Sequence, residues 1–525
     1  MSADYIVIGA GSAGCVVTRR LVEAGYSVEL VEAGPRDHPL DFRLHMPAAL
    51  SEVLSSTRYN WSFSTEPESQ MINRRMFCPR GRTLGGSSAI NGMIFVRGHP
   101  RDFDRWAERS GYPDWGYEHC LPYFKRSETA THGDPAWRGQ DGPMRITQGA
   151  LANPLFHAYL ESGAQAGHAR HDDLNGAQQE GVGPFDRTIF DGKRWSAARG
   201  YLDPLRNNGG LAIRTGTRTL ALRPARRQVD ILEAGSLRTL EATREIILCA
   251  GAIGSPQLLM LSGIGDADHL RSVGIEPEVH LPGVGRNLQD HLEVYVQYRC
   301  SRPVSLYPAL KPYNKAWIGP LWYLARQGPG ATNHFEAGGF IRSSEGVAWP
   351  DLQMHFLPIA MSYDGSHHAA GHGFQVHVGP MKPTSRGTVR LATADPMAAP
   401  LIRFNYASTA EDRAVMRAGI RKVRDLVAQP AFDDFRAEEL SPGVDWQSDD
   451  ALDAFVARHG ESAYHPSGTC RMGQDADAVV DDSGRVHGVD GLRVIDASVM
   501  PEITNGNLNA PVLMLAEKMV SGLVR

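Results

Sequence analysis

The first thirty residues alternate between short apolar runs and one longer segment with helical spacing. Residues 5–8 form a continuous apolar run, which is typical of a strand buried on both faces of a parallel sheet. Apolar residues then recur every three or four positions from Ala13 to Ala24, which predicts a helix that ends at Gly25. Residues 28–31 supply a second apolar run. This order of strand, helix and strand predicts an α/β fold with a parallel sheet at the N-terminus.

Two later stretches have the same character as these strands. Residues 245–251 and 492–496 are apolar runs that end at a glycine or polar turn, so we expect both to join the first sheet. Between them the pattern changes to strand-like alternation, as in residues 387–391, which is typical of an antiparallel sheet in an α+β second domain. Both domains are therefore expected to be discontinuous. The predicted divisions are 1–157, 198–305 and 461–525 for the first domain, and 158–197 and 306–460 for the second.

Composition narrows the class of protein. The chain has 525 residues, of which 42% are hydrophobic and 22% charged, values close to those of folded globular proteins. A net charge of −5 without a basic cluster argues against nucleic acid as a partner. The six cysteines are widely spaced, so we expect reduced thiols rather than disulfides or a metal site. Without a signal peptide or a long apolar segment, the sequence predicts a cytoplasmic protein, and it leaves peripheral attachment to the inner face of the membrane open.

A glycine motif lies at the first predicted turn. Gly9, Gly11 and Gly14 form G-x-G-x-x-G between a strand and a helix, the context in which this motif binds a dinucleotide. The helix N-terminus would face the phosphates, because its N–H groups and dipole favour negative charge. Glu32 ends the second strand, where its carboxylate can accept hydrogen bonds from a ribose. The pattern predicts a Rossmann-like dinucleotide site, with a glycine turn that binds nothing as the alternative, and it does not distinguish NAD from FAD.

A second glycine-rich segment spans residues 82–92. Its run of small and hydrogen-bonding residues would let the backbone approach an extended ligand, although a surface loop is the alternative. With this segment, residues 465–472 (His-Pro-Ser-Gly-Thr-Cys-Arg-Met) and residues 335–340, the chain resembles the glucose-methanol-choline (GMC) oxidoreductases over nearly its whole length. The resemblance also rests on residues 59–61, 82–98, 303–310 and 439–445.

The resemblance implies an FAD enzyme. The residues it places around FAD are Gly9, Gly11, Ser12, Ala13, Gly14, Glu32, Ala33, Gly85, Gly86, Ser87, Asn91, Gly92, Met93, Asp496, Ala497, Asn507 and Pro511. Related choline oxidases attach FAD covalently through a histidine where this chain has Ile90. Because isoleucine has no nucleophile, we expect non-covalent FAD.

The resemblance also implies the catalytic pair. His465 matches the family's catalytic histidine, and a histidine suits the role because its ordinary pKa of about 6.5 lets it take a hydroxyl proton near neutral pH. Asn509 corresponds to the second catalytic position, where family members carry His or Asn. It could also cap the helix predicted after Pro511, and the two roles are compatible. The helix N-terminus would then stabilise the negative charge of reduced flavin.

Within the family the chain is most similar to choline-oxidising members. Aromatic faces and a carboxylate suit a trimethylammonium group, and the resemblance assigns these roles to Trp61, Tyr464 and Glu336. Core packing for the aromatic residues and a surface charge for Glu336 are the alternatives. The expected reaction converts choline to betaine aldehyde and, through its hydrate, to glycine betaine; another small primary alcohol, such as a hydroxymethyl aromatic compound, is the alternative. The electron acceptor (oxygen, a quinone or another carrier) and the oligomeric state stay open.

No metal site is expected. The histidines His367 and His368, in the stretch 366–368, and His372 lack the spacing of metal ligands, and we interpret them as part of a loop.

Overall fold

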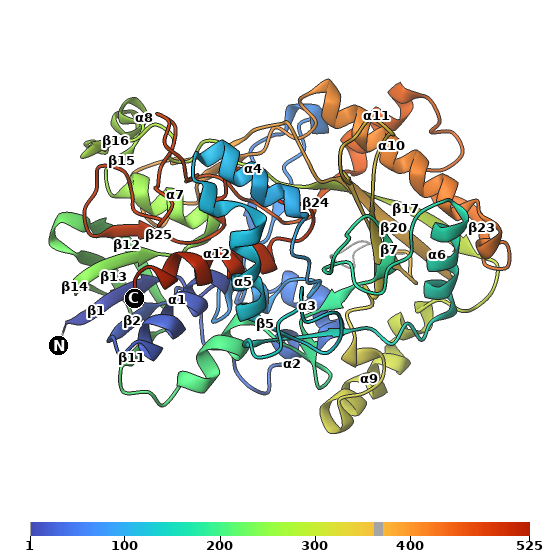
Figure 1. Cartoon of the computed structure of the whole chain (residues 1–525), viewed down its shortest axis with the longest axis horizontal. Coiled ribbons are helices and arrows are strands. Elements are labelled where there is room, and N and C mark those ends of the chain that lie inside the picture. Colours follow the sequence, from blue (N-terminus) through green and yellow to red (C-terminus); the bar gives the residue numbers. More distant parts are fainter. Residues whose placement is uncertain (1, 362–370, 525) are drawn as a thin grey trace.

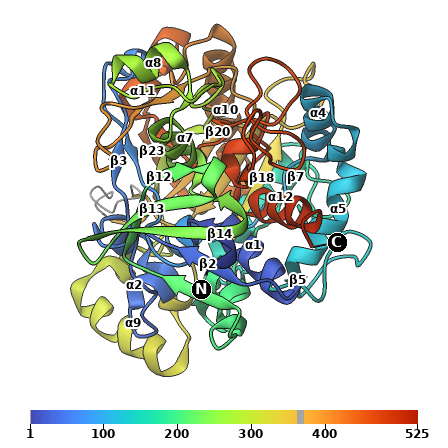
Figure 2. The same ribbon diagram turned by 90° about the vertical axis from the view of Figure 1, so that its left-hand side faces the viewer.

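Two seven-stranded sheets organise the computed structural model, which describes residues 2–361 and 371–524. In Figure 1 the first sheet lies on the left with both chain termini, and the second lies on the right beneath α10 and α11. The view in Figure 2 looks onto the first sheet and shows α1 and α12 beside it. The expected combination of a Rossmann-like parallel sheet and a large antiparallel sheet is confirmed.

The first sheet has the order β11-β2-β1-β14-β13-β12, with β25 paired to β14. β14 is long enough to serve two ladders, because its first half forms an antiparallel hairpin with β13 and its second half runs parallel to β1 and β25. Both later apolar runs therefore join the N-terminal strands, as predicted. The strands are β1 (Ala3–Ile8), β2 (Val28–Val31), β11 (Leu211–Arg214), β12 (Thr217–Arg223), β13 (Gln228–Glu233), β14 (Ser236–Leu248) and β25 (Leu492–Val494).

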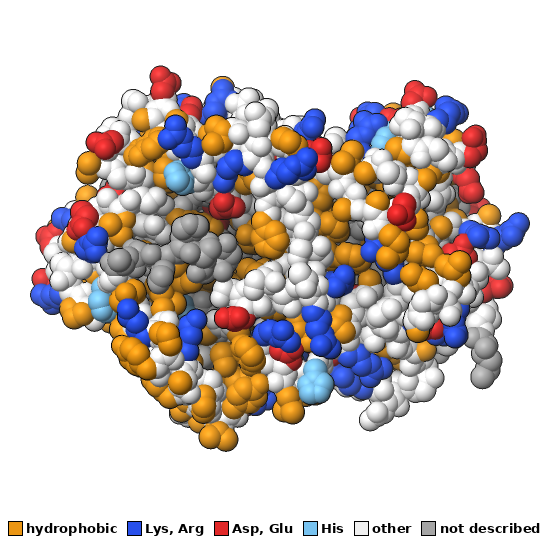
Figure 3. Space-filling view, turned by 180° about the vertical axis from the view of Figure 1, so that it is seen from behind, with side chains coloured by type: hydrophobic (Ala, Val, Ile, Leu, Met, Phe, Trp, Pro, Cys, Tyr) orange, Lys and Arg blue, Asp and Glu red, His pale blue; other side chains and the backbone are white. Residues whose placement is uncertain are grey.

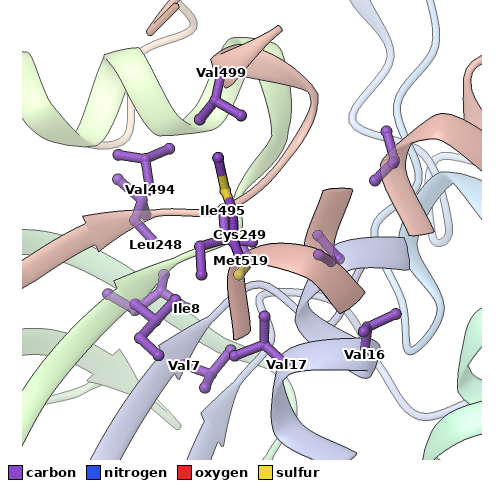
Figure 4. Close-up of a cluster of buried hydrophobic side chains, with 14 of the residues drawn as sticks. Val7, Ile8, Val16, Val17, Leu248, Cys249, Val494, Ile495, Val499 and Met519 are labelled. Carbon is purple, nitrogen blue, oxygen red and sulfur yellow. The ribbon is translucent and has the colours of Figure 1, made fainter. Parts of the chain in front are cut away.

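A continuous apolar core joins this sheet to its helices. Figure 4 shows side chains from β1, α1, β14 and β25 meeting Met519 of α12, so the first and last segments of the chain share one core. The helix α12 packs against both α1 and α5, which brings its N-terminus close to the glycine turn. The helices are α1 (Ser12–Glu23), α4 (Pro100–Ser110), α5 (Tyr117–Ser127), α7 (Gly251–Leu261), α8 (Ala267–Ser272) and α12 (Asn509–Ser521).

The second sheet is antiparallel and has the order β23-β17-β20-β19-β18-β7, with β24 paired to β17. Its core lies under α10 and α6, and it contains alternate residues of the strands β17, β19 and β20 together with aromatic rings. Its elements are α6 (Pro154–Gln165), β7 (Gly181–Pro184), β17 (Leu292–Cys300), β18 (Ala337–Ile341), β19 (Leu352–Leu357), β20 (Gly373–Pro380), α10 (Ala410–Val427), β23 (Arg436–Ser441), α11 (Asp449–His459) and β24 (Glu461–Ser462).

Two strands differ from the expected arrangement. β17 belongs to the second sheet, although the sequence places residues 198–305 with the first domain. Residues 387–391 do form a strand, β21 (Thr388–Arg390), but it pairs with β22 (Leu401–Arg403) in a separate two-stranded sheet. Alternation along the chain shows that a strand has one buried face and says nothing about which sheet provides the cover. The domain boundaries therefore stay a prediction.

Smaller elements fill the space between the two sheets and around them. They are α2 (Phe42–His45), α3 (Leu50–Leu54), α9 (Pro312–Ala325), β3 (Phe63–Ser64), β4 (Phe77–Cys78), β5 (Glu128–Ala130), β6 (Met144–Gln148), β8 (Asp186–Arg187), β9 (Ile189–Phe190), β10 (Lys193–Arg194), β15 (Ile264–Gly265) and β16 (Val279–His280). Among the described residues, no helix is both long and apolar enough to cross a membrane. All six cysteines are buried free thiols.

Candidate active site

The two glycine segments pack against each other at the end of β1. A Cβ atom at Gly14 would stand 1.9 Å from the carbonyl oxygen of Gly9, and one at Gly86 would stand 2.6 Å from the Cα of Gly11. The Gly85 N–H donates a hydrogen bond to the carbonyl oxygen of Ala10 (2.8 Å). Only glycine fits at these contacts, which explains why two motifs far apart in the sequence share this composition.

An elongated cavity of about 290 Å³ begins beside these segments. Gly11 lines it, and a Cβ atom there would meet no protein atom within 4 Å, so a side chain would project into the cavity. Among the described residues, no side chain caps the start of α1 after Gly11. The N–H groups of its first turn are therefore available to an anion. The backbone therefore forms a cradle of the kind that holds a pyrophosphate.

Glu32 lies at the end of β2 and lines the same part of the cavity. Its carboxylate accepts hydrogen bonds from the N–H groups of Ala10 (3.0 Å) and Gly34 (2.8 Å), which fix its orientation. Burial raises the pKa of Glu32 to about 7, against the opposing effect of these hydrogen bonds. Each oxygen can accept a further bond, so the geometry fits a ribose hydroxyl at this position.

At the opposite end of the cavity, a buried aspartate holds the segment that carries His465. The Asp290 carboxylate accepts hydrogen bonds from the His465 backbone N–H (2.6 Å) and from the hydroxyls of Ser462 and Tyr406. Tyr464 has a φ of 67°, a left-handed conformation that is uncommon for a tyrosine. Arg80 stabilises it by donating to the Tyr464 carbonyl oxygen (2.6 Å). The backbone before His465 is thus held in one conformation by contacts from distant segments.

Two side chains hold the His465 ring. Its Nδ1 lies 3.0 Å from Nδ1 of His291, and its Nε2 lies 3.1 Å from Nδ2 of Asn507. Gln353 in β19 donates to the other amide atom, Oδ1 of Asn507 (3.1 Å), and so turns the Asn507 N–H group towards the histidine. The histidine is therefore held by one residue that precedes β17 and by another that precedes α12.

The hydrogen bonds define which nitrogen of each ring carries a proton. The Met381 carbonyl oxygen can only accept, so the bond to it (3.3 Å) requires a proton on Nε2 of His291. Nδ1 of neutral His291 must then accept the proton of His465 Nδ1. This leaves a lone pair on Nε2 of His465, and that atom accepts from Asn507. Burial lowers the pKa of His291 to about 3 and that of His465 well below its ordinary value, so both rings are neutral.

A buried cluster of Glu293, His355 and His377 lies behind the cavity wall at the end that contains His465. The Glu293 carboxylate lies 3.2 Å from Nδ1 of His377 and 3.9 Å from Nδ1 of His355. Both histidine rings pack edge-on against Phe335, with centroid separations of 5.8 and 6.1 Å, and Phe335 lines the cavity. Burial lowers the pKa of His355 to about 4 and that of His377 to about 3. Behind Phe335, one buried carboxyl group therefore lies beside two neutral imidazoles.

Most of the residues predicted from the sequence meet in one place. The cavity lining includes Gly9, Gly11, Ser12, Ala13, Glu32, Ala33, Trp61, Gly86, Ser87, Asn91, Gly92, Met93, Tyr464, His465, Asp496, Ala497, Asn507 and Asn509. Of the described residues, Gly14, Gly85, Pro511 and Glu336 lie outside this lining. The Glu336 carboxylate instead pairs with Arg187 (3.2 Å) and accepts from the Leu151 N–H (2.8 Å). Its role as a substrate carboxylate stays a prediction, and its contacts support a structural task.

Asn509 does not cap α12. The N-cap position is Leu508, and the side-chain Oδ1 of Asn509 instead accepts from the hydroxyl of Ser12 (2.7 Å), across to α1. Its Nδ2 is buried and has no hydrogen-bond partner among the described residues. A buried amide without a partner is costly, so this N–H group is suited to bind a ligand in the cavity.

Asp290, His291 and Glu293 were not identified from the sequence. Their signal is a short run of chemically active residues, Asp-His-Leu-Glu, at the start of a strand whose other positions are alternately buried. Polar residues at buried strand positions require partners, and this requirement marks a candidate site. The histidines at 366–368 lie outside the described residues, while Nδ1 of His372 lies 3.0 Å from the Ser305 hydroxyl.

Comparisons with known proteins agree with this geometry. Family models described as GMC oxidoreductase match residues 3–293 and 383–516. The chain is 53% identical over 537 residues to the oxygen-dependent choline dehydrogenase of Proteus mirabilis (strain HI4320), covering 99% of this chain and 95% of that enzyme. It is also 53% identical over 524 residues to the enzyme of the same name from Ectopseudomonas mendocina (strain ymp), covering 98% and 93%. The solved structure of pyridoxine 4-oxidase from Mesorbium loti has a TM-score of 0.90 and 33% identity, and the match covers 99% of both chains.

Proposed function

Because the chain belongs to the GMC oxidoreductase family, we propose that it oxidises choline to betaine aldehyde and onward to glycine betaine, with FAD bound in the cavity. The observation that carries the reaction is the hydrogen-bond chain through His465, which leaves the Nε2 lone pair at the cavity wall. The substrate hydroxyl replaces the Asn507 N–H group as the donor to Nε2, which then takes the hydroxyl proton, and the Nδ1–H bond to His291 keeps the ring in place as it becomes positive. When bound, FAD supplies the acceptor for the hydride that leaves the alcohol carbon.

The residues present fit FAD, and we infer that it binds non-covalently. The uncapped start of α1 and the open space at Gly11 fit the pyrophosphate, and Glu32 fits the ribose. Ile90 also lines the cavity, and its hydrocarbon side chain cannot form a bond to the flavin. Acid precipitation tests the linkage, because non-covalent FAD stays in the yellow supernatant. Yellow colour retained in the washed pellet would contradict it.

The choline headgroup needs aromatic faces and negative charge. Trp61 and Tyr464 line the cavity and offer aromatic surface. We infer that the Glu293 carboxylate, which lies beside His377 behind Phe335, supplies the negative charge. Glu293→Gln should therefore raise KM for choline by more than it raises KM for the uncharged analogue 3,3-dimethylbutan-1-ol. Glu336→Gln belongs in the same assay, because a selective rise in KM for choline in that variant would assign the charge to Glu336, as the resemblance implies, although its carboxylate is paired with Arg187.

Anaerobic stopped-flow reduction of the bound flavin by choline tests the proposed function directly. We expect choline to bleach the flavin faster than 3,3-dimethylbutan-1-ol, and oxygen uptake to follow on aeration. The related pyridoxine 4-oxidase makes a hydroxymethyl aromatic compound the second candidate substrate, so pyridoxine belongs in the same experiment. Faster reduction by pyridoxine than by choline would assign the site to aromatic alcohols. A flavin that no alcohol reduces would exclude both.

A further inference from the structure

α9 is an apolar helix that lies on the surface. Within α9, all of which the structure describes, Trp322 alone is buried. Tyr313 is 71% exposed, Trp317 48%, Tyr323 40% and Leu324 88%. Helices that are apolar around most of their circumference normally lie inside a protein or at an interface with another apolar medium. We therefore expect the exposed face of α9 to contact a partner.

Residues of a neighbouring segment extend this apolar surface. Leu40 is 69% exposed and Phe42 38%, and the Tyr323 hydroxyl donates a hydrogen bond to the Leu40 carbonyl oxygen (2.6 Å). Figure 3 shows hydrophobic side chains gathered along the lower edge of the molecule, where α9 lies. We define the α9 patch as Leu40, Phe42, Tyr313, Trp317, Tyr323 and Leu324.

The surroundings of the α9 patch are positively charged. Residues 301–335 contain no Asp or Glu, and they carry four cations, of which Arg302 is paired with Asp434 (2.9 Å). The other three, Lys311, Lys315 and Arg326, lie within α9 or directly at its ends. In the neighbouring segment, Asp41 is paired with Arg43 (2.6 Å) and Asp37 with Arg206 (3.0 Å). An apolar, aromatic surface with cations around it is the combination that favours contact with anionic lipid headgroups.

We propose that the α9 patch docks the protein on the surface of an anionic lipid bilayer, with α9 lying in the interface between headgroups and acyl chains. Trp and Tyr favour this depth because each ring has an apolar body and a polar edge. A helix of 14 residues is too short to span the bilayer, so it lies along the surface. A second copy of the chain is a poorer occupant, because a two-fold contact would set these cations against each other.

Docking at this surface would place the bilayer beside one wall of the cavity. Trp322 of α9 packs against Met46 and Ala49, directly before α3 in the chain. Leu50 and Leu54 of α3 line the cavity itself. The lipid-facing helix and this cavity wall therefore belong to one connected piece of structure.

Vesicle flotation of the FAD-loaded protein tests the proposal without measuring activity. We expect the wild type to float with vesicles of phosphatidylcholine containing phosphatidylglycerol, and to float less with phosphatidylcholine alone or at high salt. Leu324→Glu should lower the partition coefficient tenfold or more, and Lys315→Glu at least about fivefold, because it removes one cation and adds an anion. The matched control is Leu237→Glu, since Leu237 is 75% exposed at a site away from α9 in the chain. It should leave flotation unchanged.

Two results would overturn the docking proposal. The first is a wild type that does not float with anionic vesicles, or that floats as well after Leu324→Glu and Lys315→Glu as before. The second is a lipid-free dimer, seen by analytical ultracentrifugation, that Leu324→Glu converts to monomer, because the patch would then be covered by a second copy. An unchanged oligomeric state, together with weakened flotation, supports the lipid surface.

Discussion

The cofactor end of the cavity is built around the backbone of residues 9–14. At the catalytic end, side chains from distant segments surround His465. The cofactor end depends on what is absent, because a side chain at Gly11, Gly14 or Gly86 would fill or disrupt it. The catalytic end depends on paired polar groups, because Asp290 and His291 hold the backbone and the ring of one residue. Substitutions at the cofactor end should therefore lower FAD affinity, whereas substitutions at the catalytic end should lower the rate of flavin reduction.

The same contrast explains what the sequence could predict. A strand, a glycine turn, a helix and an acid occur within 32 residues, so a local pattern was enough to predict the centre of the nucleotide site. His465 is identified by its motif, but its partners come from other segments, and only the folded chain shows that His291 faces it. Glu336 was chosen by resemblance, and the fold pairs it with Arg187. The hydrophobic periodicity could not show that β17 belongs to the second sheet, because this depends on its pairing with β20, which is distant in the sequence.

The sharpest way to break the catalytic end alone is His465→Gln. Glutamine can retain a hydrogen bond to Asn507 but cannot take a proton, so the rate of flavin reduction by choline should fall by about 10²–10⁴-fold. The FAD content should be unchanged, because the cofactor end is untouched. Stopped-flow absorbance measures the rate, and His119→Gln, at an exposed histidine of α5, is the control. Reduction at the wild-type rate would remove His465 from the mechanism.

His291→Leu should give the next largest effect, because it removes the acceptor for the His465 Nδ1 proton. Losing such an orienting partner typically costs about 10–100-fold in activity. His291→Asn retains an acceptor and should recover part of the rate. The pH profile of flavin reduction distinguishes positioning from simple damage to the fold, because an unanchored His465 can change tautomer and its apparent pKa should move. An unchanged profile in both variants would contradict the proposed hydrogen-bond chain.

Gly11→Val tests the cofactor end. The new Cβ atom meets no protein atom within 4 Å and projects into the cavity, so the protein should fold normally while FAD affinity falls about tenfold or more, as for an overpacked site. FAD fluorescence on release measures the affinity, and circular dichroism of the FAD-free protein checks the fold. Gly346→Val is the control, because a Cβ atom there also meets nothing within 4 Å. Equal FAD affinity in both variants would show that Gly11 does not face the pyrophosphate.

The smallest expected effect is a difference in how the two ends respond to pH. In the FAD-free protein, Glu32 has a pKa of about 7, raised by burial above the value near 4.5 of an unfolded chain. Its contribution to stability is present at low pH and is lost as the pH rises through 7. The catalytic end should behave in the opposite way, because burial lowers the pKa of His291 and His377 to about 3. Their contribution is present above the unfolded value near 6.5 and is lost as the pH falls below it.

Urea unfolding between pH 5 and 8 separates these two responses. Between pH 6 and 5 each buried neutral histidine should lower the free energy of unfolding by up to about 1.4 kcal/mol per pH unit. His377→Gln should therefore make the acid limb less steep and leave the behaviour near pH 7 unchanged. Glu32→Gln should act with the opposite sign between about pH 4.5 and 7, because it removes a loss of stability with rising pH and so makes the acid limb steeper. If both variants instead changed the slope of the acid limb in the same direction, Glu32 and His377 would not titrate independently.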